Sequence, residues 1–489
     1  MLQRINNATL INSVKWKSIE TTAIKIVQTT VSIAIARLVG PEEYSIVPLT
    51  LVFINLLSIL VNNSFGVALI QNKDAKSEDF RSAVSFNLVL AFLLFFLLWI
   101  SSDYIAAFYD SDEFSDVLRV LGMIIPMHGI LSICNAYIAK NFLFKEQCVC
   151  NLVAISVAGT LGIVLAIRGV GAWSLVIYQL AYYLLYAIGL ELAFKWKIYF
   201  KFSVNSIKRM LKFGLASVGS CVIAFFSDEI GTILLGKYET HANLSLYSKG
   251  KQFPTISADI VNTVIAGVSL PALSLLQDDA EKMREQVSVS TRAYSYISGP
   301  FLVGVAICAE PMVYLLLGTK WLGAIPIVQI MCLYYVFQPV LQVSGQVLLA
   351  IGKPTLKMMI EIAKMIISLS LLTLCLKYGI IAVALSRVAV NIIMYALVLA
   401  VNKITIKLSI RRQLMDFVIS LIPAILMGVC IYLISFIKLP TAIQFIIQVF
   451  FGVVVFVMIS KVVKNQTYVL LEKGAKKLIR ERRHKDSKS

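Results

Sequence analysis

Long apolar segments without a charged residue recur along the chain, and they constrain its fold more than any other feature. Residues 44–72, 321–352 and 439–460 are three of these segments. A bilayer core about 30 Å thick is crossed by about 20 apolar residues in a helix, so each segment can span a membrane. Hydrophobic residues make up 58% of the 489 residues and charged residues only 15%, too few to cover a water-soluble protein of this size. The sequence therefore predicts an all-α polytopic membrane protein.

The pattern predicts 14 transmembrane helices, six before a basic segment and eight after it. An even number of helices returns the chain to the same side of the membrane, so helices 7–12 can repeat helices 1–6 in the same orientation. We predict two pseudo-symmetric six-helix lobes followed by two C-terminal helices. The predicted helices are 11–38, 44–63, 82–102, 117–139, 147–167, 171–194, 210–236, 243–271, 288–309, 321–350, 355–376, 379–402, 413–437 and 440–463. The predicted domains are 1–194 (N-terminal lobe), 195–212 (basic cytoplasmic connector), 213–402 (C-terminal lobe), 403–464 (helices 13 and 14) and 465–489 (basic cytoplasmic tail).

The basic connector 195–212 sets the predicted orientation, because it has six cations and no acidic residue: Lys195, Lys197, Lys201, Lys208, Arg209 and Lys212. Loops on the same predicted side are rich in Lys and Arg, whereas an acidic cluster in 103–116 falls on the other side. Cytoplasmic loops carry the excess of Lys and Arg, so both termini are predicted to be cytoplasmic. Much of the net charge of +18 lies in the connector and the tail, where anionic membrane lipids are the expected partner. We therefore predict no binding of nucleic acid.

Polar residues form faces on several predicted helices that would otherwise contact lipid. Their spacing of three and four residues places them on one side of each helix. Such faces at membrane depth line either water or another helix, so we interpret them as the wall of a shared cavity. The alternative is that they hold helices together through side-chain hydrogen bonds. The candidate cavity-lining residues are Gln28, Asn55, Asn62, Asn262, Gln338 and Gln342.

Charged residues inside the predicted helices are a second sign of a polar interior at membrane depth. Each costs at least about 2.5 kcal/mol at a helix centre, so it needs a partner, water or a function. Asp228 and Glu229 in helix 7 lie at a similar depth to Lys249 and Lys251 in helix 8. They form either a structural ion pair or a switchable one that substrate or a proton breaks. The candidate residues for ion coupling or switching are Asp228, Glu229, Asp259 and Glu361.

The chain lacks the motifs of an energy-converting or catalytic domain. It has no Walker loop, no HExxH pattern and no catalytic triad in a soluble segment, so we predict that it is not an enzyme. The eight cysteines are scattered and fit no metal-site spacing. We predict no cofactor and no metal. If the chain transports a substrate, the driving force would be an H⁺ or Na⁺ gradient, the membrane potential or the gradient of the substrate itself.

Five short motifs point to a known family. They are 36–44 (ARLVGPEEY), 65–71 (FGVALIQ), 244–248 (LSLYS), 270–279 (LPALSLLQDD) and 321–326 (WLGAIP). In order and spacing they resemble bacterial Wzx-type polysaccharide flippases, the polysaccharide-transport branch of the multidrug/oligosaccharidyl-lipid/polysaccharide (MOP) exporter superfamily. The chain departs from the pattern at Gly231, where relatives often place an Asp late in helix 7, and at Ser45, where a Gly is usual.

The resemblance implies that the protein flips an oligosaccharide repeat unit linked to polyprenyl (pyro)phosphate across the bacterial cytoplasmic membrane by alternating access. The product would enter O-antigen, exopolysaccharide or teichuronic acid, with glycosyltransferases and a polymerase as further partners. An anionic head group needs cations, and the sugars need amide and hydroxyl partners. The candidate cations for the head group are Lys25, Arg37, Lys249, Lys251, Lys364 and Arg387.

Two other transport functions fit the same architecture. An ion-coupled exporter of the multidrug type would favour an acidic cavity for organic cations, whereas cations are at least as numerous here. A flippase for a peptidoglycan lipid precursor would share the same predicted architecture.

Overall fold

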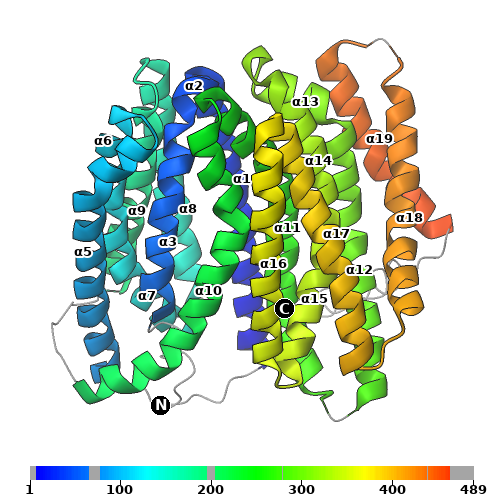
Figure 1. The fold of residues 1–489 in the computed structure, drawn as a ribbon, viewed down its shortest axis with the longest axis horizontal. Helices are drawn as coiled ribbons and strands as arrows, with labels where there is room; N and C mark the ends of the chain where they lie inside the picture. The colour runs from blue at the N-terminus through cyan, green and yellow to red at the C-terminus, as the bar shows by residue number, and fades with distance from the viewer. Residues whose placement is uncertain (1–6, 65–76, 195–203, 278, 438, 463–489) are drawn as a thin grey trace, which may run out of the picture. The chain divides into compact units, whose positions relative to one another are not determined.

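The computed structural model describes residues 7–64, 77–194, 204–277, 279–437 and 439–462 (Figure 1). Every regular element in this part of the chain is a helix, which confirms the all-α prediction. The chain divides into two compact units, Met1–Ser248 and Lys249–Ser489. The boundary falls inside one long helix, α11 (His241–Ser274).

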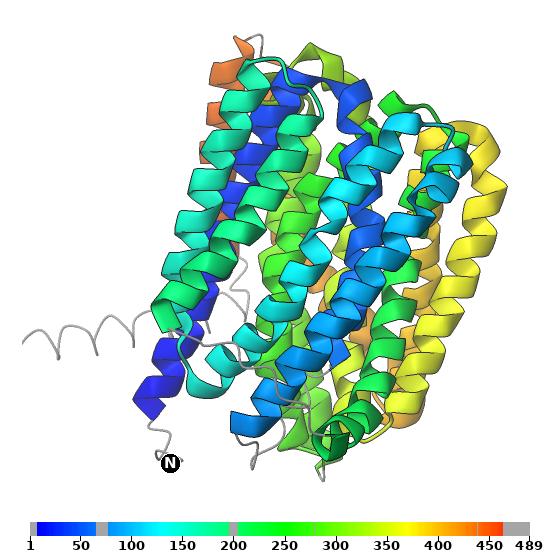
Figure 2. The same cartoon turned by 90° about the vertical axis from the view of Figure 1, so that its left-hand side faces the viewer.

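The first unit contains every helix up to the start of α11. In Figure 2 the blue and cyan helices of this unit run alongside one another. Its other elements are α1 (Asn7–Val39), α2 (Pro41–Tyr44), α3 (Ile46–Ser64), α5 (Ser77–Phe108), α6 (Asp112–Gly122), α7 (Ile124–Asn141), α8 (Phe144–Ile167), α9 (Trp173–Phe194) and α10 (Val204–Tyr238).

Glycines on α8 let this helix approach both α1 and α9 closely. A Cβ atom on Gly159 would lie 2.5 Å from Cγ2 of Val31 on α1. A Cβ atom on Gly162 would lie 2.8 Å from Cβ of Tyr178 on α9 and 3.1 Å from Cδ1 of Ile35 on α1. Small residues at such contacts allow the van der Waals packing that joins helices in a membrane.

The second unit contains the remainder of α11 and the C-terminal helices. Here α18 packs against both α12 and α19 (Figure 1). Its elements are α12 (Ala280–Ile307), α13 (Ala309–Leu316), η1 (Thr319–Ala324), α14 (Ile325–Val336), α15 (Gln338–Ala350), α16 (Pro354–Cys375), η2 (Leu376–Tyr378), α17 (Gly379–Thr405), α18 (Ile410–Ile434) and α19 (Thr441–Val462).

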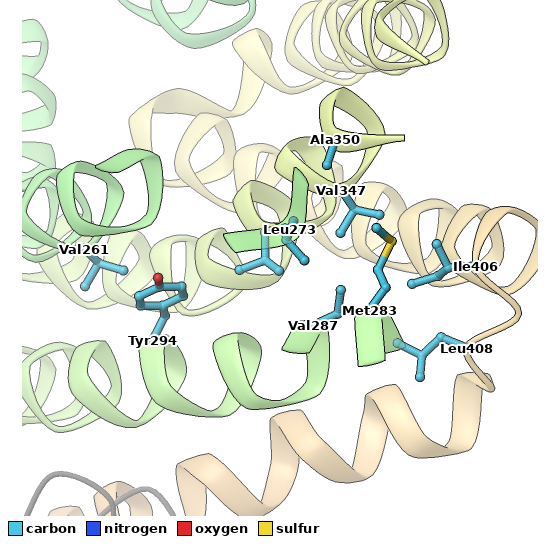
Figure 3. Close-up of a cluster of buried hydrophobic side chains, with 10 residues drawn as sticks. Val261, Leu273, Met283, Val287, Tyr294, Val347, Ala350, Ile406 and Leu408 are labelled. Carbon is cyan, nitrogen blue, oxygen red and sulfur yellow. The ribbon is translucent and has the colours of Figure 1, made fainter. Parts of the chain in front are cut away.

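An apolar cluster organises one end of the second unit. Figure 3 shows Met283 and Val287 of α12 close to Ile406 and Leu408, which belong to the connection between α17 and α18. Val347 of α15 joins the same buried cluster. The connection turns at Lys407, whose backbone lies in the left-handed region with φ 56°. The cluster therefore holds this connection against α12 and α15.

Each of the 14 predicted membrane segments coincides with one helix or with two or three successive helices. Ten segments in the described part of the chain are long and apolar enough to cross a membrane, or 11 if the bent pair α12 and α13 is one span. One of the ten, Pro354–Thr405, contains both α16 and α17. The prediction of a multi-pass membrane protein is confirmed, whereas the number 14 is not.

The predicted lobes and connector stay predictions. The compact units divide at residues 248 and 249, whereas the sequence places the division in the basic connector. Residues 204–212 of that connector form the first turns of α10. Its first part (195–203), the motif 65–71 and the basic tail 465–489 lie outside the described residues.

Candidate functional site

A buried hydrogen-bonded network joins α1, α8 and α9 in the first unit. The carboxylate of Glu20 is only 2% exposed, pairs with Nζ of Lys17 at 2.8 Å and accepts a hydrogen bond from Nδ2 of Asn151 at 3.0 Å. The hydroxyl of Tyr182 donates to Oδ1 of Asn151 at 2.8 Å. The amide of Asn151 thus connects an acid on α1 with a phenol on α9.

A second group of polar side chains joins α7, α8 and α9. The amide of Gln147 donates to Oδ1 of Asn135 at 3.0 Å and to the hydroxyl of Tyr186 at 3.1 Å. The hydroxyl of Tyr186 also donates to Oδ1 of Asn135 at 3.1 Å. The ring of Tyr186 stacks on the ring of Tyr182 with centroids 6.2 Å apart, so the two groups adjoin.

The single histidine of α7 lies between α3 and α9. Nδ1 of His128 is 3.4 Å from Nδ2 of Asn62 on α3, and its ring centroid is 4.8 Å from that of Tyr183 on α9. One helical turn further along α7, Ser132 accepts a hydrogen bond from the amide of Asn87 on α5 at 2.8 Å. Polar contacts therefore connect the interior of this unit across α1, α3, α5, α7, α8 and α9.

The acid of the first group, Glu20, is not among the residues that the sequence pattern predicted. Glu20 lies within predicted helix 1, next to the polar face that contains Gln28. Two spacings of four residues mark other members of the two polar groups, Gln147 with Asn151 on α8 and Tyr182 with Tyr186 on α9. Polar residues one turn apart on neighbouring apolar helices were the signal that could have identified this network.

The predicted site residues of the first unit have different environments. Lys25 and Gln28 on α1 and Asn62 on α3 are half-buried, whereas Arg37 and Asn55 are exposed. On α10, Asp228 is exposed and Glu229 is half-buried. The hydroxyl of Thr232 donates to the Glu229 carboxylate at 2.9 Å. The structure therefore brings Asn62 into contact with His128 and holds Glu229 against its own helix.

Arg387 on α17 is deeply buried in the second unit. It is 4% exposed, and its guanidinium donates to Oγ of Ser368 on α16 at 3.2 Å and to the hydroxyl of Tyr334 on α14 at 3.3 Å. The same guanidinium lies 5.3 Å from the centroid of the Tyr334 ring, a cation–π distance. Nδ2 of Asn391 donates to the backbone carbonyl of Tyr334 at 2.9 Å. Arg387 thus connects three helices of this unit.

Lys249 on α11 is also buried, with 1% exposure, and its ammonium donates to Oε1 of Gln252 at 3.0 Å. Its neighbour Lys251 is half-buried. One turn along α11, the hydroxyl of Thr255 donates to that of Tyr335 on α14 at 2.9 Å. The other predicted site residues of this unit share a half-buried environment: Asp259, Asn262, Gln338, Gln342, Glu361 and Lys364.

An apolar cavity of ≈ 370 Å³ lies between α12, α18 and α19. Phe301 and Gly304 line it from α12, Cys308 lines it just after α12, and Met427 and Gly452 line it from α18 and α19. Its chemistry suits a hydrocarbon chain. No group of three or more His, Cys, Asp or Glu that could hold a metal ion occurs among the residues described.

The fold and the buried polar groups define a class of protein. Solved structures with this fold include a lipid II flippase MurJ in an inward closed conformation, with a TM-score of 0.71 and 16% identity over 91% of this chain and 99% of that one. They also include an inward-facing multidrug resistance MATE transporter of the MOP superfamily, with a TM-score of 0.65 and 14% identity over 80% of this chain and 98% of that one. The protein is a multi-pass membrane protein with the fold of MOP-superfamily transporters.

The sequence then assigns the chain within this class. Residues 34–326, more than half of the chain, match the polysaccharide biosynthesis protein family, and the chain belongs to that family. Among curated relatives, the succinoglycan biosynthesis transport protein ExoT of Rhizobium meliloti is 22% identical over 68% of this chain and 67% of its own length.

Two further relatives come from other organisms. The teichuronic acid biosynthesis protein TuaB of Bacillus subtilis is 24% identical over 71% of this chain and 72% of its own length. The lipopolysaccharide biosynthesis protein WzxC of Escherichia coli is 25% identical over 70% of each chain. The resemblance to polysaccharide-transport proteins that the five motifs predicted is confirmed.

Proposed function

We propose that the protein is a flippase for a polyprenyl-(pyro)phosphate-linked oligosaccharide repeat unit, used in the biosynthesis of a surface polysaccharide. The observation that carries the proposal is that one chain combines membership of the polysaccharide biosynthesis family with a transporter fold. A family member with this fold needs a substrate that begins inside the cell, ends in a polymer outside and is too polar to cross lipid. A lipid-linked oligosaccharide has these properties.

The anionic head group would be bound by cations at membrane depth. Lys25, Lys251 and Lys364 are half-buried, so water or a ligand can reach part of each side chain. Lys249 and Arg387 are almost fully buried, with 1% and 4% exposure. We therefore assign direct head-group contact first to the half-buried lysines, with Arg37 at the outer mouth and the two buried cations shaping the field around them.

The uncharged parts of the substrate would meet different surfaces. Sugars need hydrogen-bonding partners, and the half-buried amides of Gln28, Asn62, Asn262, Gln338 and Gln342 offer both donors and acceptors. The isoprenoid tail is apolar, and the ≈ 370 Å³ cavity between α12, α18 and α19 matches its chemistry. The rest of the tail would remain in the bilayer, together with membrane lipids that contact the exposed apolar helix faces.

Transport would use alternating access in the bacterial cytoplasmic membrane, with both termini in the cytoplasm. Glycosyltransferases would supply the lipid-linked repeat unit, and a polymerase would consume it on the other side. We infer no catalytic step within this chain. An H⁺ or Na⁺ gradient would act through Asp228, Glu229, Asp259 or Glu361, since a change in protonation or ion binding at membrane depth alters the charge that the helices must accommodate.

Reconstitution tests the proposal directly. The purified protein is placed in liposomes with a fluorescent polyprenyl-pyrophosphate-linked oligosaccharide, and an impermeant quencher reports how fast the label reaches the outer leaflet. We expect the label to become accessible faster than in protein-free liposomes. Lys25→Ala and Lys251→Ala should abolish this gain, whereas the matched control Lys353→Ala, at an exposed position before α16, should retain it.

Genetic replacement in the native host provides the second test. Deletion should eliminate a surface polysaccharide and cause lipid-linked repeat units to accumulate, and the Lys25→Ala variant should not restore the polymer. Two outcomes would contradict the proposal. Sensitivity to cationic dyes after deletion, with normal polysaccharide, would favour an ion-coupled multidrug-type exporter. Rescue of cells that lack their lipid II flippase would favour a peptidoglycan precursor as the substrate.

A further inference from the structure

A small polar cavity lies at one end of the second unit, between α12, α17 and α18. Ser288 and Thr291 line it from α12, Asn402 lines it from α17, and Gln413 and Asp416 line it from α18. The volume open to the centre of a guest is ≈ 10 Å³, at the lower limit of what holds one water molecule or one small ion. The cavity therefore has room for a single small guest.

Apolar residues close one side of this cavity. Val287 and Leu408 line it and also belong to the buried cluster shown in Figure 3, where both are labelled. Because this cluster fixes the connection between α17 and α18, it also fixes the distance between the polar groups that the two helices present. One side of the cavity is thus formed by a buried apolar cluster.

The amide groups around the cavity use their donors elsewhere. Nδ2 of Asn402 donates to Oγ of Ser344 and to Oε1 of Gln413, both at 2.9 Å. Nε2 of Gln413 donates to the backbone carbonyls of Leu399 at 3.2 Å and Leu408 at 3.1 Å. These four bonds determine which way both amides point. They leave Oδ1 of Asn402 as an acceptor at the cavity.

Three oxygens at the cavity have no hydrogen-bond partner in the described part of the chain: Oγ of Ser288, Oδ1 of Asn402 and Oδ2 of Asp416. Ser288 and Asn402 are each 1% exposed, and Asp416 is 8% exposed. A buried acceptor without a partner is unfavourable by about 1–3 kcal/mol, and more when it is charged. Three such oxygens from three helices around one small space indicate a bound guest.

Several charged side chains lie near the cavity, and they differ in how close they come to it and in how exposed they are. Arg292 on α12 forms an ion pair with Asp416, with its Nε 3.6 Å from Oδ1, the carboxylate oxygen other than the unpartnered one. Lys403, Lys407 and Arg411 on the α17 and α18 side are exposed, so solvent screens them. Asp416 is the acid that lines the cavity.

We propose that this cavity binds one Na⁺ ion. Its polar lining offers oxygen atoms from a carboxylate, an amide and two hydroxyls, the ligand type that hard cations prefer. An anion would face acceptor oxygens and is excluded. None of the carboxylates predicted for ion coupling is part of this cavity.

A bound ion would join three helices at one point. Asp416 is on α18, the first of the two C-terminal helices, whereas Ser288 and Asn402 are on α12 and α17. An ion held by all three would fix α18 to the rest of the second unit. This role does not depend on the identity of the transported substrate.

Binding of ²²Na⁺ to the purified full-length protein tests the site without any transport assay. We expect one saturable site per chain, together with a rise in the thermal unfolding midpoint in NaCl over choline chloride at equal ionic strength. Removal of a ligating charge by Asp416→Asn should weaken binding by at least about tenfold. Ser288→Ala, which deletes one ligand and little volume, should also weaken it measurably.

A matched control is available on the same helix as Asp416. Ser420 is 1% exposed, as Ser288 is, but its hydroxyl donates to the carbonyl of Phe417 within α18. Ser420→Ala should therefore leave Na⁺ affinity unchanged. If Asp416→Asn does not fold, the Na⁺ affinities of Ser288→Ala and Ser420→Ala are compared instead, and a lower affinity in Ser288→Ala alone supports the site. Equal thermal midpoints in NaCl and choline chloride, or Na⁺ binding that neither cavity variant changes, would overturn the proposal and leave the cavity to a water molecule.

Discussion

Replacement of Asn151 by Ala should destabilise the first unit by more than any single exposed substitution in it. Asn151 is 7% exposed, donates to the Glu20 carboxylate at 3.0 Å and accepts from Tyr182 at 2.8 Å. A hydrogen bond to a charged group contributes about 1.5–3 kcal/mol and a neutral one about 0.5–1.5 kcal/mol. The variant loses both bonds, which removes a partner from Oε1 of Glu20 and from the hydroxyl of Tyr182. We expect a loss of about 2–4 kcal/mol in the free energy of unfolding.

Thermal unfolding in detergent, followed by tryptophan fluorescence, measures this effect. For a unit of this size, about 2–4 °C of midpoint corresponds to 1 kcal/mol, so the midpoint should fall by about 4–16 °C. Asn141→Ala is the control, since Asn141 is exposed and bonds only the carbonyl of Tyr137 in its own helix, and it should change stability by less than about 0.5 kcal/mol.

A double-mutant cycle separates the two bonds of Asn151. Tyr182→Phe removes one partner and keeps the ring, so the coupling energy between the two substitutions should be about 0.5–3 kcal/mol. Equal midpoints for Asn151→Ala and Asn141→Ala, or effects of Asn151→Ala and Tyr182→Phe that simply add, would refute the network as a source of stability.

Three further substitutions probe other contacts, each by the same unfolding assay. Gly162→Ala places a Cβ atom 2.8 Å from Cβ of Tyr178, so it should destabilise by about 1–3 kcal/mol through overpacking. Tyr296→Phe removes the 2.6 Å hydrogen bond that links α12 to Ser460 on α19, and a loss of about 0.5–1 kcal/mol is expected. Arg387→Lys keeps the charge but loses the planar fork that reaches two hydroxyls and stacks on a ring, so a loss of about 1–2 kcal/mol is expected. An unchanged midpoint in any variant would show that the contact concerned does not stabilise the fold.

Much of the fold was predictable because a membrane restricts what an apolar chain can form. Each long uncharged segment has to satisfy its backbone hydrogen bonds internally, which requires a helix. The 14 predicted segments therefore coincide with helices or successive helices. The number of spans was harder to predict, since α10 and α11 carry polar residues that place them outside the ten apolar segments found in the described part of the chain.

The candidate site was only partly predictable. The polar faces identified Asn62, and the intramembrane charges identified Arg387, yet neither pattern shows what a side chain contacts. The structure places Arg387 among hydroxyls and a tyrosine ring with 4% exposure, an environment that suits a structural contact. Glu20 was overlooked because its partner Asn151 lies 131 positions away in sequence, on α8, and Asn151 in turn accepts from Tyr182 on α9, another 31 positions along.

The sequence by itself determined that this protein is helical, membrane-embedded and related to polysaccharide transporters, because hydrophobicity and short motifs are local properties of the chain. Only the tertiary structure decided which buried polar groups meet. Helix packing brings Glu20, Asn151 and Tyr182 together, and it leaves oxygens of Ser288, Asn402 and Asp416 around one small cavity. Such contacts depend on how helices rotate and approach one another, and many rotations are compatible with the same apolar pattern.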